Sequence, residues 1–143
     1  MGLLMLADAT PEMSAGALVI DAVRLMTERN VGSVAITDGR KCVGMFTERD
    51  LMRRVVCAGK DAQTTRVKDV MTSPVICVTD ATSVAHAAEL MRSHHIRHLA
   101  IVDGFGHLQG VVALRYLLYA LMDDLEAKVG DLEGYLMADA PGG

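Results

Sequence analysis

Residues 30–39 of the chain read NVGSVAITDG, and residues 95–104 read HIRHLAIVDG. The second stretch repeats the first sixty-five residues later, with an apolar run followed by an Asp-Gly pair in both. The same offset relates AVRLM at 22–26 to AAELM at 87–91. After the Asp-Gly pair the offset grows to sixty-six, so that Gly44 corresponds to Gly110 and Leu51 to Leu117. One extra residue in a turn is a tolerated loop insertion, and we infer an internal structural repeat.

Each copy is expected to contain the same elements in the same order, because helical spacing of apolar residues gives way to short apolar runs around a turn. In the first copy these elements are a helix over 18–29, strands over 34–36 and 42–46, and a helix from 47 to 58 that ends at Gly59. In the second copy they are a strand over 75–78, a helix over 83–94, strands over 98–102 and 108–112, and a helix from 113. The opening strand of the first copy is poorly marked, and residues 3–6 are its only candidate.

The composition is that of a folded protein. The chain has 143 residues, of which 51% are hydrophobic and 22% charged, and this suits two small halves that share a core. A net charge of −4 and scarce aromatic residues argue against a nucleic-acid partner. The three cysteines lack metal-ligand spacing and are expected to be small buried side chains in a reducing cytoplasm. The apolar run at 111–122 contains Arg115 and is too short to span a bilayer, so we expect no membrane partner and a cytoplasmic location.

Three stretches carry a resemblance to a known family: VMTSPV at 70–75, IRHLAIVD at 96–103 and GMFTERDL at 44–51. With their order and the internal repeat, they resemble the cystathionine-β-synthase-type (CBS) domain, two copies of which form a Bateman module. The resemblance covers roughly residues 12–122. It implies an α+β fold of two small three-stranded sheets packed with helices in pseudo-two-fold symmetry.

The repeat also predicts the domain organisation. We expect a first repeat over 1–62 that includes the N-terminal strand and loop, a linker and start of the second repeat over 63–74, a second repeat over 75–122, and a C-terminal helix and tail over 123–143. Either copy alone would leave one sheet face and one helix face exposed, so the pair is the expected folding unit.

Thr47 and Asp50 stand where a strand is expected to end and a helix to begin. Thr is a favoured N-cap and an acidic residue three positions later resembles a capping box, so the pair has a purely structural explanation. In the functional alternative, the helix N-terminus suits a phosphate and the two carboxylate oxygens suit the hydroxyls of a ribose. Gly44 in the preceding strand would let a ligand or another backbone approach closely.

The resemblance assigns binding roles to both repeats. In similar modules the pattern Gly-x-x-Thr-x-x-Asp binds ribose and phosphate, and Gly44, Thr47 and Asp50 match it. The other repeat typically builds the base pocket, and the matching residues here are Thr72, Val75, Ile76, Ile96 and Arg97. Arg97 and His98 lie where similar modules place basic residues near the phosphates. In the second copy Ala113 replaces Thr47 and Tyr116 replaces Asp50, so we expect one competent site.

The expected function is therefore that of a regulatory module that binds an adenine nucleotide and performs no chemistry. AMP, ADP and ATP are the expected ligands, with NADH and S-adenosylmethionine as alternatives, and neither a cofactor nor a metal is required. A CBS-type dimerisation or interaction module with a vestigial pocket is the main alternative, which the losses at Ala113 and Tyr116 favour. An enzyme is disfavoured, because the sequence offers no nucleophile–base pair, metal cluster or paired carboxylates in one cleft.

The C-terminal segment predicts self-association. Leucines recur with heptad-like spacing at Leu114, Leu118, Leu121, Leu125, Leu132 and Leu136. The first half of this helix is expected to pack on the second repeat, and Gly130 and Gly134 are expected to weaken the second half. The apolar face beyond residue 123 needs a cover. A second copy of the chain is the expected one, which makes a homodimer that signals to an unidentified effector protein.

Overall fold

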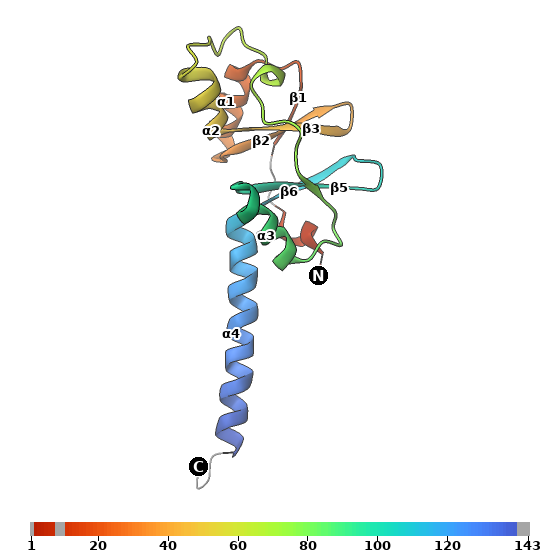
Figure 1. Ribbon diagram of the computed structural model, residues 1–143, viewed down its shortest axis with the longest axis vertical. Helices are drawn as coiled ribbons and strands as arrows, with labels where there is room; N and C mark the ends of the chain where they lie inside the picture. The colour runs from red at the N-terminus through yellow and green to blue at the C-terminus, as the bar shows by residue number, and fades with distance from the viewer. Residues whose placement is uncertain (1, 8–10, 140–143) are drawn as a thin grey trace.

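The computed structural model describes residues 2–7 and 11–139 and contains two three-stranded sheets (Figure 1). The first sheet has the order β1-β2-β3, with β1 at Glu12–Ser14, β2 at Ser33–Asp38 and β3 at Lys41–Thr47. The second has the order β4-β5-β6, with β4 at Cys77–Val78, β5 at His98–Val102 and β6 at Leu108–Ala113. In both sheets the first strand is parallel to the central strand, and the third is antiparallel to it. The predicted α+β fold is confirmed.

The two halves agree in small details as well as in topology. The antiparallel ladder is interrupted after Ile36 in the first sheet and after Ile101 in the second. The helix before each central strand ends at a residue with positive φ, which is 53° at Asn30 and 54° at His95. Non-glycine residues rarely adopt this left-handed conformation, so its recurrence sixty-five residues later is strong evidence for the internal repeat.

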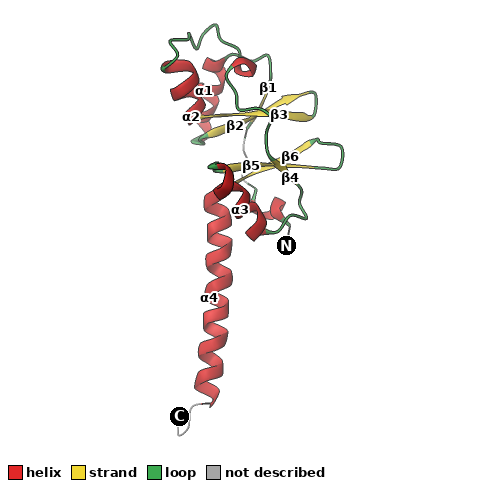
Figure 2. Cartoon of the chain, viewed as in Figure 1, coloured by secondary structure: helices red, strands yellow, loops and turns green. Residues whose placement is uncertain are grey.

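Helices cover the outer faces of the sheets, and the two sheets face each other (Figure 2). The first sheet is covered by α1 (Val19–Arg29) and by the short helix α2 (Glu48–Asp50), which continues as a π-helix, η2 (Leu51–Val56). The second sheet is covered by α3 (Val84–His94) and the start of α4 (Leu114–Asp139). The helices predicted over 18–29 and 83–94 are therefore confirmed.

Residues 3–6 do not form the predicted opening strand. They form a 3-10 helix, η1 (Leu3–Leu6), and Leu3 is buried in the core of the second sheet. The opening strand of the first sheet is instead β1. Leu3–Leu6 is apolar throughout and lacks the alternation of a half-buried strand, so it is better buried as a compact turn.

The opening turns of the two repeats are exchanged. The 3-10 helix η3 (Val67–Asp69) opens the second repeat in the sequence, yet Val67 is buried in the core of the first sheet. Since η1 packs on the second sheet in the same way, each repeat supplies a turn to the other. The predicted domain boundaries at 62 and 74 divide the chain in sequence order. In the packing, η3 belongs with the first sheet and η1 with the second.

Buried side chains form two separate cores joined by a thin apolar contact. The first core surrounds Phe46, and the second surrounds Leu117. Between the sheets a smaller cluster contains Ala35, Met45 and Val111. Each large buried side chain stabilises its own half by about 1.5–3 kcal/mol. The cluster between the sheets is therefore much smaller than either core.

The three cysteines are free thiols, and the expectation that they are buried is wrong for two of them. Cys57 follows the end of η2, and Cys77 lies on the short edge strand β4, so both are exposed. Cys42 is partly buried, and this burial, with a smaller contribution from Cys77, raises the pKa of its thiol to about 11. Burial also raises the pKa of Cys77.

Helix α4 leaves the second repeat as a single long helix (Figure 1). At 1.5 Å per residue, its 26 residues extend about 39 Å. The helix runs through Gly130 and Gly134, at both of which an added Cβ would meet no other atom within 4 Å. Over the described part of the chain, no helix has both the length and the apolarity that a membrane span requires.

Candidate functional site

A cavity of about 680 Å³ lies between the two repeats, and we call it the inter-repeat cleft. Eight of the nine predicted site residues line it, namely Thr47, Asp50, Thr72, Val75, Ile76, Ile96, Arg97 and His98. The first two come from repeat 1 and the other six from repeat 2 in the sequence. The fold therefore brings together side chains from both halves of the chain, as predicted.

Thr47 and Asp50 form the capping box that their spacing predicts. The backbone N–H of Asp50 donates to the Thr47 hydroxyl at 3.2 Å, and the backbone N–H of Thr47 donates to the Asp50 carboxylate at 3.1 Å. Thr47 has the extended backbone of an N-cap, with φ −120° and ψ 166°. The structural explanation of the pair is correct, and the same two residues also line the cleft.

Asp50 is 5% exposed, and its carboxylate already accepts several hydrogen bonds. The Thr72 hydroxyl lies 3.0 Å from Oδ1 and 3.1 Å from Oδ2, and Nε of Arg54 lies 3.7 Å from Oδ1. A carboxylate has about four acceptor sites. The Thr47 amide and the single proton of the Thr72 hydroxyl use about two of them, so about two remain, and a ribose that engaged both carboxylate oxygens would compete with the Thr72 hydroxyl.

Gly44 is the one predicted site residue that does not line the cleft. A Cβ at this position would lie 2.9 Å from Cγ and 3.0 Å from Cε of Met71, and closer still to Sδ. Gly44 is therefore small because Met71, beside the exchanged turn η3, packs against the strand. Gly110 shows a similar arrangement in the second repeat, where a Cβ would lie 3.3 Å from Cδ2 of Leu4 in η1.

Cationic side chains line much of the inter-repeat cleft. They are Arg49, Arg53, Arg54 and Arg97, against the two carboxylates of Glu48 and Asp50, and the imidazoles of His94, His95 and His98 lie in the same lining. The whole chain carries a net charge of −4, so this local excess of positive charge is a departure from the rest of the molecule. Such a concentration favours a phosphate-bearing ligand.

The sequence analysis missed the arginines at 49, 53 and 54. They follow Thr47 on the helical segment α2–η2, where Arg49 and Arg53, four residues apart, are neighbours on the helix surface, and all three line the cleft. That spacing in ERDLMRR at 48–54 was the signal that could have identified them. Arg54 is held in place by a hydrogen bond of 2.6 Å from its guanidinium to the carbonyl of Met71.

Half-buried apolar side chains form another part of the lining. Val75 packs against the contact between the sheets, while Ile76 and Ile96 pack against the second core. Their remaining surface faces a cavity that also holds guanidinium groups and a carboxylate. An apolar wall with a few polar groups is typical of sites that bind a flat ring and orient it by its polar substituents.

A second crevice of about 800 Å³ adjoins the first and shares Gly32, Glu48, Arg97 and His98 with it. Ala113 stands here in the position of Thr47 and provides no hydroxyl cap. Tyr116 stands in the position of Asp50, but it is not part of the lining, and its ring lies 5.1 Å from the Arg115 guanidinium. The two crevices are therefore chemically unequal, although the folds around them are alike.

Metal ligation has no visible basis in the part of the chain that the structure describes. No three His, Cys, Asp or Glu side chains come together there in a group that could hold an ion. The cationic character of the inter-repeat cleft instead favours an anionic ligand.

Comparison with known proteins identifies the family. The sequence profile of the CBS domain matches residues 13–57 and 67–123, which correspond to the two structural repeats. The chain belongs to the CBS domain family. The CBS domain-containing protein CBSX3 of Arabidopsis thaliana, a mitochondrial protein, is 31% identical over 82% of this chain and 59% of its own length. This CBS chain spans about half to two thirds of the length of curated relatives such as this one.

Solved CBS structures share the fold. A CBS protein from Burkholderia ambifaria MC40-6, described as a signal-transduction protein, is 32% identical with a TM-score of 0.75, over 83% of this chain and 86% of that one. The CBS domain protein PAE2072 from Pyrobaculum aerophilum, complexed with AMP, is 27% identical with a TM-score of 0.77, over 89% and 99% of the two chains. The predicted tandem CBS architecture is confirmed.

Proposed function

We propose that this CBS chain is a regulatory module that binds one adenine nucleotide in the inter-repeat cleft and performs no chemistry of its own. The observation that carries the proposal is the composition of the cleft, in which Thr47 and Asp50 from one repeat face apolar side chains and Arg97 from the other. The AMP complex of the Pyrobaculum protein supports an adenine nucleotide as the ligand. AMP, ADP and ATP are the first candidates, followed by NADH and S-adenosylmethionine.

Each part of the ligand has a matching part of the cleft. The ribose is assigned to Thr47 and Asp50, with the Thr72 hydroxyl as the group that it displaces from the carboxylate. The adenine is assigned to the apolar wall of Val75, Ile76 and Ile96. The phosphates are assigned to Arg97 and His98, supported by the arginines on the helical segment α2–η2. Gly44, which packs against Met71, is no longer part of this assignment.

Regulation would follow from the separate cores. A ligand that contacts both repeats stabilises the arrangement in which it binds best, and it shifts the population by as much as its affinities for the two arrangements differ. The contact between the sheets is small compared with either core, so it offers little resistance to such a shift. The readout passes to a separate effector protein, for which we propose a cytoplasmic setting, and a homodimer is part of the same proposal.

The second crevice is proposed to be weak or empty. It lacks the hydroxyl and the carboxylate at the positions equivalent to Thr47 and Asp50. Each lost hydrogen bond in a desolvated site costs about 1–3 kcal/mol, so the same ligand would bind there at least tenfold more weakly. One nucleotide per chain is therefore the expected stoichiometry.

One observation favours the alternative of a vestigial pocket. The Asp50 carboxylate is satisfied by groups of the protein itself and is nearly buried. If the Thr72 hydroxyl does not give way, the cleft holds the two repeats together without a ligand. This CBS pair would then act only in dimerisation or in binding another protein.

Isothermal titration calorimetry distinguishes these functions. The purified chain is titrated with AMP, ADP, ATP, NADH and S-adenosylmethionine. The titrations are then repeated with the variants Arg97→Ala and Arg115→Ala. Both side chains are exposed, but only Arg97 lines the inter-repeat cleft. Loss of a charge-assisted hydrogen bond costs about 1.5–3 kcal/mol, so Arg97→Ala should weaken binding by about 10- to 100-fold. Arg115→Ala should leave the affinity unchanged.

Three outcomes would overturn the proposal. Absence of binding to every nucleotide at millimolar concentration supports the vestigial pocket. Greater sensitivity to Arg115→Ala than to Arg97→Ala moves the site to the second crevice. Turnover of a nucleotide during the titration, measured by chromatography of the product, makes the chain an enzyme.

A further inference from the structure

Helix α4 carries a stripe of exposed apolar side chains, which we call the α4 stripe. It consists of Leu118, Met122, Leu125, Val129, Leu132 and Leu136, each between 45% and 60% exposed. Successive members are separated alternately by four and three residues, which is the spacing of one face of a coiled coil. The α4 stripe differs from the one predicted from leucines alone, because Leu114 packs on the second core and Leu121 is partly buried.

We propose that the α4 stripe pairs with that of a second copy of this chain, in register, as a parallel two-stranded coiled coil. With Leu118 at a d position, all the d positions are leucine and the central a position is Val129. Leucine at d with a β-branched residue at a favours two parallel strands over three or four. Leucine at every d position and valine at the central a position therefore favour two helices.

The charges beside the stripe select the same arrangement. Lys128 falls at a g position and Glu133 at the e position of the next heptad, which are the two positions that meet between parallel helices in register. Lys128 of each chain would therefore lie beside the partner's Glu133, twice in the dimer. An antiparallel pair would instead bring e positions together, where Glu126 and Glu133 repel. In the single chain Lys128 contacts Asp124 at 3.2 Å, but both side chains are exposed and such a pair is weak.

The glycines of α4 are compatible with this pairing. Gly130 and Gly134 fall at b and f positions, on the side of the helix away from the stripe, and nothing lies within 4 Å of a Cβ added there. They lower the helix propensity of the isolated segment without removing a contact from the pairing face. Most of the stability of a helix in a protein comes from packing of its apolar face, so association supplies a stabilisation that the exposed stripe lacks in the single chain.

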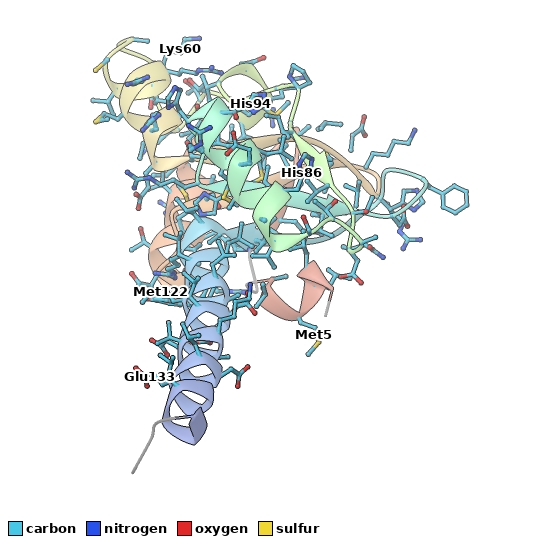
Figure 3. The ribbon with its side chains drawn as sticks, turned by 60° about the horizontal axis from the view of Figure 1, so that its bottom comes forward. Met5, Lys60, His86, His94, Met122 and Glu133 are labelled. Atoms are coloured by element: carbon cyan, nitrogen blue, oxygen red, sulfur yellow. The ribbon has the colours of Figure 1, made fainter. Side chains whose placement is uncertain are left out.

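The body of the chain does not cover the stripe. Helix α4 runs away from both sheets (Figure 1), and its lower part, where Glu133 is labelled, holds its side chains away from the rest of the protein (Figure 3). Lys128 of one copy and Glu133 of another carry opposite charges at positions that meet. The partner that we propose for the α4 stripe is therefore a second copy of this chain and not an unrelated helix.

Sedimentation velocity of the full chain tests the pairing. The wild type should sediment at twice the chain mass of 15.3 kDa. The double variant Leu125→Asp/Leu132→Asp should sediment as a monomer, because it places charges in the seam. Ala127→Asp, at an outer f position of the same exposed helix, is the matched control and should remain dimeric. All three substituted side chains are exposed, so circular dichroism should show the two repeats still folded. A monomeric wild type, a trimer, or a dimer that survives the double substitution overturns the proposal.

A charge-swap experiment tests the direction of the helices. Lys128→Glu and Glu133→Lys each place like charges together in a parallel homodimer, so each should weaken it by at least several fold. An equimolar mixture of the two variants restores two opposite-charge pairs and should dimerise as well as the wild type, measured by fluorescence transfer between labelled chains. Failure of the mixture to recover would show that the helices are not parallel and in register. The pairing gives the interface of the homodimer in the proposed function, and neither experiment requires nucleotide, so the pairing and nucleotide binding can fail separately.

Discussion

Replacing Gly44 by alanine tests whether this glycine serves packing or ligand binding. The backbone at Gly44 does not have the positive φ that only glycine tolerates well, so alanine is compatible with the strand. The new methyl group would overlap the side chain of Met71, with 2.9 Å to Cγ and 3.0 Å to Cε. Overpacking of this kind costs about 1–3 kcal/mol, whereas removing the backbone freedom of glycine recovers about 0.5–1 kcal/mol. We expect a net loss of about 1–2 kcal/mol.

The assay is urea unfolding followed by circular dichroism, together with calorimetric titration of the nucleotide. In thermal unfolding, followed by the same circular dichroism signal, a loss of this size should lower the melting temperature by about 3–8 °C for a chain of this length. Gly110→Ala is the matched control, because its nearest neighbours would lie at 3.2 and 3.3 Å and have less to move. In a Met71→Ala background, Gly44→Ala should be neutral or stabilising, which gives a coupling energy of about 1–3 kcal/mol.

Nucleotide affinity separates the two roles of Gly44. Because Gly44 does not line the inter-repeat cleft, the folded Gly44→Ala variant should bind as the wild type does. If the variant has the same urea midpoint as the wild type but no longer binds the nucleotide, Gly44 contacts the ligand. The explanation that Gly44 makes room for Met71 would then be wrong. Additive effects of the two substitutions would also contradict it.

Two further perturbations follow from the environment of single residues. Asp50→Ala should destabilise the chain by about 2–4 kcal/mol, because it leaves the backbone amide of Thr47 and the hydroxyl of Thr72 without their acceptor. In the same urea titration, Glu48→Ala at the exposed neighbouring position should cost about 0.5 kcal/mol or less. Equal effects of the two substitutions would contradict the capping role of Asp50. Iodoacetamide should modify the exposed Cys57 first at pH 8. Cys42, whose pKa is about 11, should react roughly 100-fold more slowly than a thiol of ordinary pKa, and its reaction should accelerate as the pH rises toward 11. Peptide mass spectrometry measures both rates, and a Cys42 rate independent of pH would refute the assigned burial.

The fold was largely predictable because the sequence carries each signal twice. The apolar runs before Asp38 and Asp103 predict both central strands, and the structure confirms them. The opening of the first repeat was not predictable from local pattern, since the cover for Leu3–Leu6 lies on the other repeat. The strand registers make Glu12 equivalent to Cys77, whereas Leu3 and Val67 are equivalent in their packing, so no single offset aligns both the turn and the strand.

Most of the predicted site residues line the cleft, but the hydrogen bonds between Thr72 and Asp50 were not predictable from the sequence. Spacing alone predicted that Thr47 and Asp50 cap a helix, and the family resemblance added the ribose-binding role, which stays a proposal; the fold brings residues of the other repeat to them. The hydrogen bonds from Thr72 to Asp50 join residues far apart in the sequence, so no local pattern reports that the carboxylate is already occupied. For Gly44, a sequence pattern could not distinguish close approach of a ligand from close approach of Met71.

The central claim is that one adenine nucleotide joins the two repeats at the inter-repeat cleft. A crystal structure of the chain grown with saturating AMP or ATP tests it most directly. We predict density for one nucleotide per chain, with the ribose beside Thr47 and Asp50, the base against Val75 and Ile76, and the Thr72 hydroxyl turned away from the carboxylate. A nucleotide bound only in the second crevice beside Ala113, or a cleft that remains empty while Thr72 still donates to Asp50, would contradict the account.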